Sequence, residues 1–144
     1  MPQLRRHQTL EGGSGSIVKT TTTTTPILVP DGHKHLVWTI ENDANLSLES
    51  GEEVDFHLQT TYNEGRDWEA IANIHWSNSE DGTAPTHHVL FDGNVFTSAA
   101  NIVPDTTAAD DAVVDRPIGE QLRIHILFTN GGTIDYRSGV LTWR

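Results

Sequence analysis

The sequence predicts an all-β protein, an antiparallel β-sandwich or jelly roll of about seven or eight strands with an extended N-terminal arm. The clearest observation is the alternation of apolar and polar residues over 54–62, which is typical of a strand with one buried and one solvent-facing side. A second is the spacing of Gly, Pro, Asn and Asp between such runs. A third is the absence of a segment with convincing helical periodicity.

The strand over 54–62 is expected to bury one set of side chains and to expose the other. The expected buried set is Val54, Phe56, Leu58, Thr60 and Tyr62. The expected exposed set is Asp55, His57, Gln59 and Thr61. Residues 63–66 then supply Asn and Gly for a turn into a second strand that carries Trp68 and Ile71. Together these residues predict a hairpin.

Other strands are expected on both sides of this hairpin. They cover 35–40, 71–76, 87–91, 121–128 and 134–143, with turns at 30–32, 92–94 and 130–132. Inward positions by alternation are Trp38, Trp68, Leu122, Ile124, Ile126 and Phe128. Trp143 is out of phase with Ile134, Tyr136 and Val140, so it is expected on a surface or at a subunit contact. The acidic stretch 104–112 is expected to be a surface excursion.

The first 26 residues differ in composition from the rest, which predicts an arm (1–26) before a sandwich domain (27–144). The Gly/Ser-rich stretch 11–16 is expected to be mobile because it has little apolar surface to offset the entropy of ordering. The threonines at 20–25 favour extended backbone because they are β-branched. Composition leaves two alternatives open: a flexible leader, or a strand that pairs with a neighbour's sheet edge. The arm residues expected to bind a partner are Leu4, Arg5, Arg6, Ile17, Val18, Lys19, Thr22 and Thr24.

Composition restricts the classes of partner. The formal net charge of -11 disfavours nucleic acid and acidic membranes as partners, because binding to phosphate groups depends on clustered Lys and Arg. No run approaches the roughly 20 apolar residues of a membrane span, and no signal peptide is expected. The chain has no cysteine, which excludes disulfides, thiolate metal sites and a cysteine nucleophile. Stability is therefore expected to come from packing and assembly.

Histidine pairs do not predict a metal site. His87 and His88 are adjacent, so on a strand they point to opposite faces. His33 and His35 could share a side, but two ligands leave a zinc coordination sphere half empty. No metal and no cofactor are expected.

His57 and His125 occupy outward positions of alternating strands. They are expected at the surface or at an interface that responds to pH between about 5.5 and 7.5.

No group of residues predicts catalysis. The acidic pairs Asp110–Asp111 and Glu52–Glu53 are expected on a solvated surface, because a glycosidase also needs a sugar cleft between its two acids. Residues 42–45 lack the glycine and glutamate of an EF-hand loop. No nucleophile elbow or phosphate-binding glycine pattern occurs either. The sequence predicts a protein that is not an enzyme.

The run Thr61–Trp68 resembles the Asp-box hairpin, Ser/Thr-x-Asp/Asn-x-Gly-x-x-Trp, of sialidase-type propellers and other β proteins. The role of that motif is structural, and it occurs once here. The resemblance implies a turn that sets the fold and carries no catalytic role.

A second resemblance covers roughly residues 46–143. The alternating strand is followed by Tyr-Asn-Glu-Gly-Arg-Asp-Trp-Glu-Ala-Ile, then Arg-Pro-Ile-Gly-Glu-Gln-Leu-Arg-Ile, then Gly-Gly-Thr and a final strand. This pattern looks like small β-sandwich structural proteins of tailed bacteriophages. The resemblance implies a virion protein assembled in the host cytoplasm, foremost a capsid decoration (cement) protein that binds between capsomers. It implies the major capsid protein or another virion protein as partner, and a homo-oligomer, with a trimer favoured.

Two alternatives stay open at this point. One is a protein associated with the phage neck, tail or fibre. The other is a carbohydrate-binding β-sandwich module, which needs exposed aromatic rings as a platform. The residues that discriminate are Trp38, Trp68, Trp76 and Trp143.

Overall fold

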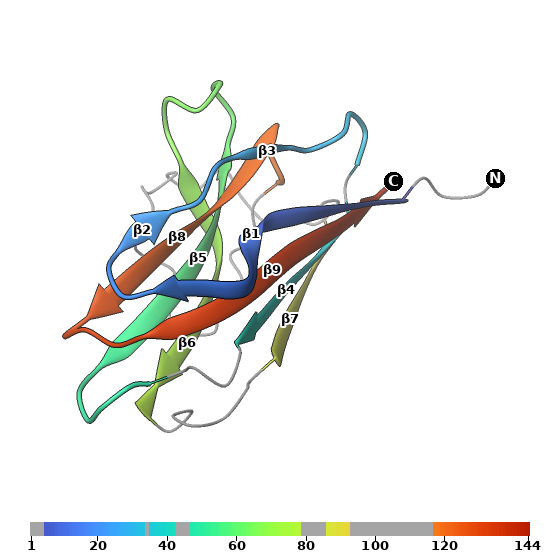
Figure 1. The fold of residues 1–144 in the computed structure, drawn as a ribbon. Helices are drawn as coiled ribbons and strands as arrows, with labels where there is room; N and C mark the ends of the chain where they lie inside the picture. The colour runs from blue at the N-terminus through green and yellow to red at the C-terminus, as the bar shows by residue number, and fades with distance from the viewer. Residues whose placement is uncertain (1–4, 34, 43–46, 79–85, 93–116) are drawn as a thin grey trace.

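The computed structural model of the chain describes residues 5–33, 35–42, 47–78, 86–92 and 117–144. These residues form two antiparallel β-sheets packed face to face and contain no α-helix, so the all-β sandwich prediction is confirmed (Figure 1). Within these ranges, no helix long and apolar enough to cross a membrane is present.

The first sheet has four strands in the order β1-β9-β4-β7. Their bounds are β1 Arg5–Val18, β9 Ile134–Trp143, β4 His35–Asn42 and β7 Thr86–Asp92. Every neighbouring pair in this sheet is antiparallel. Strand β7 pairs with β4. The residues that follow the turn expected at 92–94 lie outside the described residues.

The second sheet has the order β2-β8-β5-β6, and β3 also pairs with β8. The bounds are β2 Thr22–Thr23, β3 Ile27–Leu28, β8 Gln121–Thr129, β5 Glu53–Thr61 and β6 Glu69–Ser77. Because β2 and β3 lie one after the other along β8, they act as a single interrupted edge strand. The strand expected over 71–76 lies within β6.

Strand pairing is nested along the chain. The outermost pair is β1 with β9, followed inward by β2 and β3 with β8, β4 with β7, and β5 with β6. One long antiparallel ribbon is therefore folded over so that successive pairs alternate between the two sheets. This is the connectivity of a double-sheet jelly roll.

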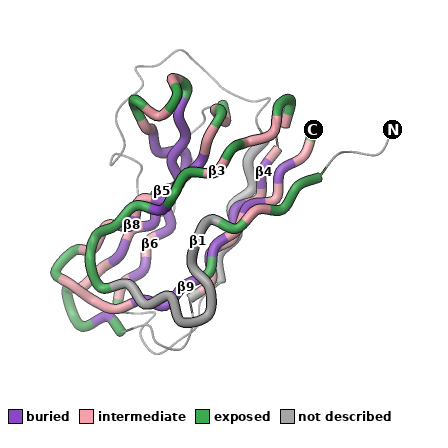
Figure 2. Tube along the Cα trace, turned by 45° about the horizontal axis from the view of Figure 1, so that its top comes forward, coloured by how far each residue is buried: buried purple, intermediate pink, exposed green. Residues whose placement is uncertain are grey.

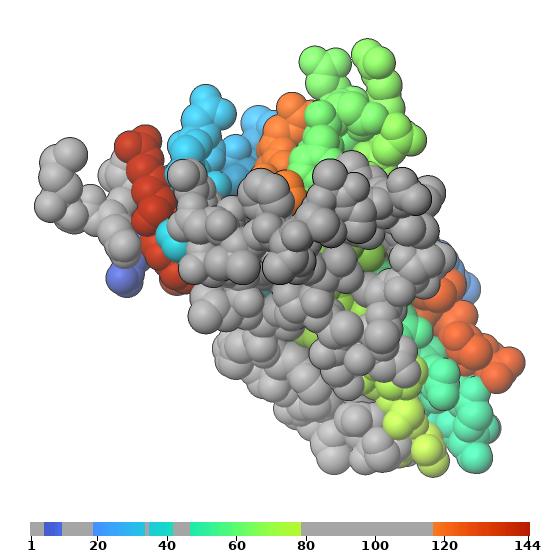
Figure 3. Space-filling view, turned by 180° about the vertical axis from the view of Figure 1, so that it is seen from behind, coloured from blue at the N-terminus to red at the C-terminus, as the bar shows by residue number. Residues whose placement is uncertain are grey.

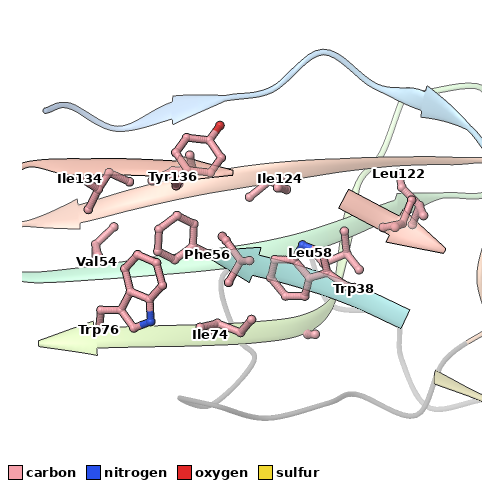
Figure 4. Packing of buried hydrophobic residues seen from close by; sticks show 14 of the residues in the cluster. Trp38, Val54, Phe56, Leu58, Ile74, Trp76, Leu122, Ile124, Ile134 and Tyr136 are labelled. Atoms are coloured by element: carbon pink, nitrogen blue, oxygen red, sulfur yellow. The ribbon is translucent and has the colours of Figure 1, made fainter. Parts of the chain in front are cut away.

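Aromatic and aliphatic side chains fill the space between the sheets (Figure 4). Phe56 on β5 packs edge-on against Trp76 on β6 with ring centroids 4.5 Å apart. It also contacts Tyr136 on the opposite sheet at 5.8 Å. The buried Trp38 donates its indole Nε1–H to Ser138 Oγ over 2.9 Å, which satisfies its polar atom inside the core. The core therefore joins both sheets through large apolar side chains.

The alternation on β8 and β9 predicted inward residues correctly. Leu122, Ile124 and Ile126 are fully buried, and so are Ile134 and Val140. Trp143 lies on the other face of β9, as its phase indicated, and is half-buried.

Two expectations for residues 54–62 are wrong. Tyr62 is 38% exposed, because it lies beyond the end of β5 in the loop, where strand alternation no longer applies. His57, Gln59 and Thr61 point outward but are buried. The physical reason is position: β5 is flanked by β6 and β8, so side chains from both neighbours surround its outer face. One of them is Arg123, whose Nε donates to Gln59 Oε1 over 2.5 Å.

The Thr61–Trp68 loop closes on itself through hydrogen bonds. Gly65 N donates to Thr61 Oγ1 over 2.9 Å, and Trp68 Nε1 donates to Gly65 O over 3.0 Å. Gly65 has a φ of 82°, a conformation that glycine adopts without strain. The inward position expected for Trp68 is wrong: its ring is half-buried outside the core, with the Arg123 guanidinium 4.2 Å from the ring centroid.

Replacing Phe56 by alanine should lower the free energy of unfolding by about 3–5 kcal/mol, because it removes the ring that connects both sheets and leaves a cavity. Chemical denaturation measures this change. Leu28→Ala is the matched control, because Leu28 is 68% exposed and its truncation should change little. A Phe56→Ala variant as stable as the control would show that the ring is not part of the core.

Candidate interaction surface

The N-terminal segment lies on an edge of the chain's own four-stranded sheet. Strand β1 pairs with β9 along the outer edge, so residues that the sequence assigned to an arm take part in the sandwich (Figure 1). Division of the chain at residue 26 and partner binding by the arm stay predictions. Leu4 lies outside the described residues.

Pairing between β1 and β9 is regular only at its N-terminal end. Five consecutive pairs run from Arg5 opposite Trp143 to Thr9 opposite Gly139. The register then shifts between Thr9 and Gly12, and again between Gly12 and Ile17. These shifts fall in the Gly/Ser-rich stretch, where few side chains can fix a register. We call residues 5–9 the edge segment, because the shifts separate it from the remainder of β1.

The edge segment is held to the sandwich without apolar side chains. Its inward positions, opposite the buried Val140 and Thr142, are Gln8 and Arg6. Arg6 is exposed, and the buried Gln8 Oε1 has no hydrogen-bond partner in the described part of the chain. None of the five residues belongs to the hydrophobic core cluster. Backbone pairing is therefore the main described attachment of this segment.

Gly139 shapes the β9 edge to receive the edge segment. A Cβ atom at this position would lie 3.2 Å from the Gln8 carbonyl oxygen and 3.2 Å from His7 Nε2. Contacts of this length are tighter than most Cβ contacts, so a side chain at this position would make the His7 ring and the Gln8 backbone shift by a few tenths of an ångström.

An aromatic pair lies beside the edge segment on the outer face of the same sheet. Trp143 stacks on His35 with ring centroids 5.4 Å apart and an interplanar angle of 17°. Arg5 is the register partner of Trp143 on the other side. Figure 3 shows, from behind, a small visible part of the edge segment (blue) next to the end of β9 (red) at one end of the molecule. This end combines basic and aromatic side chains in a chain of net charge -11.

The threonine run is bound to β8. Thr21 Oγ1 accepts a hydrogen bond from Phe128 N over 3.2 Å, and Thr22 and Thr23 pair with β8. Thr24 is buried; its Oγ1 accepts from Ile124 N over 2.8 Å and its own N donates to Ile124 O over 2.9 Å. The run therefore fixes the chain to the five-stranded sheet just after β1. In Figure 2 most of residues 19–26 is exposed, with the buried Thr24 as an exception.

The structure separates the predicted arm residues into groups. Arg5, Arg6, Lys19 and Thr22 are exposed, whereas Thr24 is buried. Ile17 and Val18 pair with Asp135 and Ile134. Sequence reasoning missed His7, Gln8, His35 and Gly139. A signal for Gly139 was present, because a glycine in an otherwise regular strand often marks close approach of another backbone.

A polar cluster covers the outer face of the five-stranded sheet. His57 and His125 are direct cross-strand partners with ring centroids 6.3 Å apart. Asp55 Oδ1 lies 2.9 Å from His75 Nδ1 and accepts from Asn73 Nδ2 over 3.0 Å. The outward orientation of His57 and His125 agrees with the sequence, but His57 is only 2% exposed.

His125 connects this cluster to the threonine run. Its Nδ1 lies 3.0 Å from Thr23 Oγ1. Burial lowers the pKa of His125 below the ordinary value of 6.5, and the nearby positive charge of Arg123 lowers that pKa further. Protonation of His125 is thus less favourable in the folded protein than in the unfolded chain.

The described residues contain no group of three or more His, Cys, Asp or Glu side chains that could hold a metal ion. His33 Nδ1 lies 2.8 Å from Thr142 Oγ1, while His35 stacks on Trp143, so these two side chains have different partners. The side chains of His87, His88, Asp110 and Asp111 lie outside the described ones.

No protein-family model, curated protein or solved structure matches the chain.

Stability should fall as the pH is lowered through about 6.5, because the unfolded chain takes up a proton at His125 before the folded protein does. The contribution of this histidine is complete above the unfolded pKa and is lost progressively toward the lower folded pKa. Thermal melts between about pH 5 and 8 measure the slope. His125→Gln, which cannot titrate, should flatten it, and an unchanged slope would contradict the assignment.

Thr24→Val should lower the free energy of unfolding by about 1–3 kcal/mol, because it removes the buried acceptor of the Ile124 N–H while keeping the side-chain shape. Thr22→Val is the matched control within the same run. Thr22 is exposed, so the control should stay within about 0.5 kcal/mol of the parent protein. Equal effects in denaturant titrations would show that the run is not anchored at Thr24.

Proposed function

We propose that this chain is a non-enzymatic structural protein of a virion, foremost a capsid decoration (cement) protein, and that its edge segment is an assembly element. One observation carries the proposal: residues 5–9 lie on a sheet edge through regular backbone pairing and contribute no side chain to the core. A strand held in this way can pair with another sheet edge while the sandwich stays folded.

The arrangement of the core supports a binding role for the edges. All large side chains of the core cluster come from residues outside the edge segment, and they join the two sheets. Trp38, Phe56 and Trp76 are fully buried among them. Release of the edge segment thus leaves this packing in place. Assembly through an edge is compatible with the stability of the remaining strands.

Partner chemistry follows from charge and geometry. The edge segment carries Arg5, Arg6 and His7, so an acidic partner surface attracts it and a strongly basic one does not. Backbone pairing requires an open strand edge on the partner. The resemblance to phage structural proteins names the class of such a partner: the major capsid protein or another virion protein, with this chain acting as a homo-oligomer.

The tryptophans give less support to a carbohydrate-binding module. Trp38 and Trp76 are buried. Of the two that are half-buried, Trp68 has Arg123 over its ring and Trp143 has His35 stacked on it. Each half-buried ring thus has one face already in contact with a side chain, whereas a sugar platform needs open rings.

A neck, tail or fibre role would use the same backbone pairing and basic residues of the edge segment and would differ only in the partner.

Removal of residues 1–9 should abolish attachment to the virion while the sandwich still unfolds cooperatively, because no described side chain of the core is lost. Co-sedimentation of the purified protein with virion shells lacking it measures attachment, and circular dichroism measures the fold.

Leu28→Ala is the control for a surface change elsewhere and should co-sediment like the parent protein. Binding by the truncated chain at the parent level would overturn the assembly role of the edge segment. Co-sedimentation with isolated tails in place of shells would assign the protein to the tail.

A further inference from the structure

We propose that the acceptor of the edge segment is strand β9 of a second copy of this chain, so that copies exchange residues 5–9 in a closed ring. This inference rests on the proposed function, because it names the partner of the same segment. It starts from the observation that the structure already contains one acceptor edge with the required shape.

The exchanged contact repeats the contact seen within one chain. In the folded monomer, five register pairs join residues 5–9 to the stretch from Gly139 to Trp143. A second copy presents the same stretch, so the same backbone hydrogen bonds form between chains when both segments leave their own edges. Exchange costs no hydrogen bond. The equilibrium between the monomer and the exchanged ring therefore depends on chain concentration and on the conformation of the connecting residues.

Gly139 makes the β9 edge specific for this segment. The 3.2 Å approach of a Cβ atom at Gly139 to His7 Nε2 and to the Gln8 carbonyl oxygen shows how closely the two strands fit. A side chain at the corresponding position of another strand edge would make residues 7 and 8 shift by a few tenths of an ångström. A second copy of the chain offers the segment the edge that it already fits.

The connecting residues allow the exchange. Register shifts on either side of Gly12 separate residues 5–9 from Ile17 and Val18, which stay opposite Asp135 and Ile134. Between them lies the Gly/Ser-rich stretch, whose glycines accept many backbone angles. The seven residues 10–16 span at most about 23 Å when extended at about 3.3 Å per residue. That reach suits a neighbour in direct contact.

Charge favours pairing of copies at this location. The chain has a net charge of -11, whereas the edge segment carries Arg5 and Arg6. A second copy therefore presents an acidic body to a basic segment, which offsets part of the repulsion between like-charged chains. Salt screens both this attraction and the repulsion between the two acidic chains.

A closed ring leaves no β9 edge unpaired. A single donated segment would leave an unpaired edge on the donor, which invites uncontrolled association. In a cyclic arrangement each chain donates one segment and accepts one, so every β9 edge is paired.

Engineered cysteines test the exchange directly, because the native chain contains none. His7 and Leu141 are register partners on the outer face. Antiparallel partners lie about 4.5–5.5 Å apart at Cα, which a disulfide can span. One chain carries His7→Cys and a second, differing in tag mass, carries Leu141→Cys. The two are co-expressed, purified at low salt and oxidised.

Exchange predicts a disulfide-linked adduct of the two tagged chains, and a ladder up to trimer when one chain carries both substitutions. The matched control is Arg6→Cys with Leu141→Cys, because Arg6 points to the other face of the strand. Adduct formation at the control level, with the doubly substituted chain cross-linked only within monomers, would overturn the inference.

The same samples distinguish failure of the inference from failure of the proposed function. If the chains stay monomeric but removal of residues 1–9 abolishes shell binding, the edge segment has an assembly role and its acceptor is another protein. That result overturns the inference and leaves the proposed function standing. Cross-linked rings that never bind shells or tails keep the inference and reject the virion role.

Discussion

The packing of Phe56 against Tyr136 is the contact on which the rest of the structure depends, because it is made between the two sheets. Trp76 supports the same ring from within its own sheet. Apolar burial is non-directional and fixes only that these faces meet. Nested antiparallel pairing then fixes which strands lie opposite each other, because backbone hydrogen bonds are satisfied in one register at a time. The apolar core and the backbone hydrogen bonds between paired strands together define the sandwich.

Core packing and edge pairing are carried by different residues of this molecule. The central strands contribute the apolar side chains, whereas residues 5–9 contribute backbone pairing and basic groups at one edge. Local opening is least costly where few apolar contacts are lost, so the edge segment is the described part of the structure best suited to exchange partners. The proposed assembly role of the edge segment therefore leaves the contact made by Phe56 intact.

The threonine run shows how one composition serves two physical roles. β-branching favours extended backbone throughout the run, which explains why it forms an edge strand. Hydroxyl groups then decide its attachment: Thr24 receives the Ile124 N–H inside the protein, and Thr23 meets His125 on the outer face. The run anchors the chain after a segment whose glycines leave it loosely registered. A firm anchor beside a loosely registered strand suits the proposed exchange, because the strand can leave while the anchor stays in place.

The sequence by itself determined the all-β class, the turns and most inward positions, because strand alternation and turn chemistry are local properties. It also indicated that Trp143 differs from its neighbours on the last strand. The tertiary structure decided which strands became central or edge strands, and this reversed the exposure expected for His57 and placed Trp68 outside the core. It also decided that β1 pairs with β9, bringing residues 5–9 onto Gly139 across almost the whole length of the chain. Pairing partners so distant in sequence depend on how the whole ribbon folds over, which no local pattern specifies.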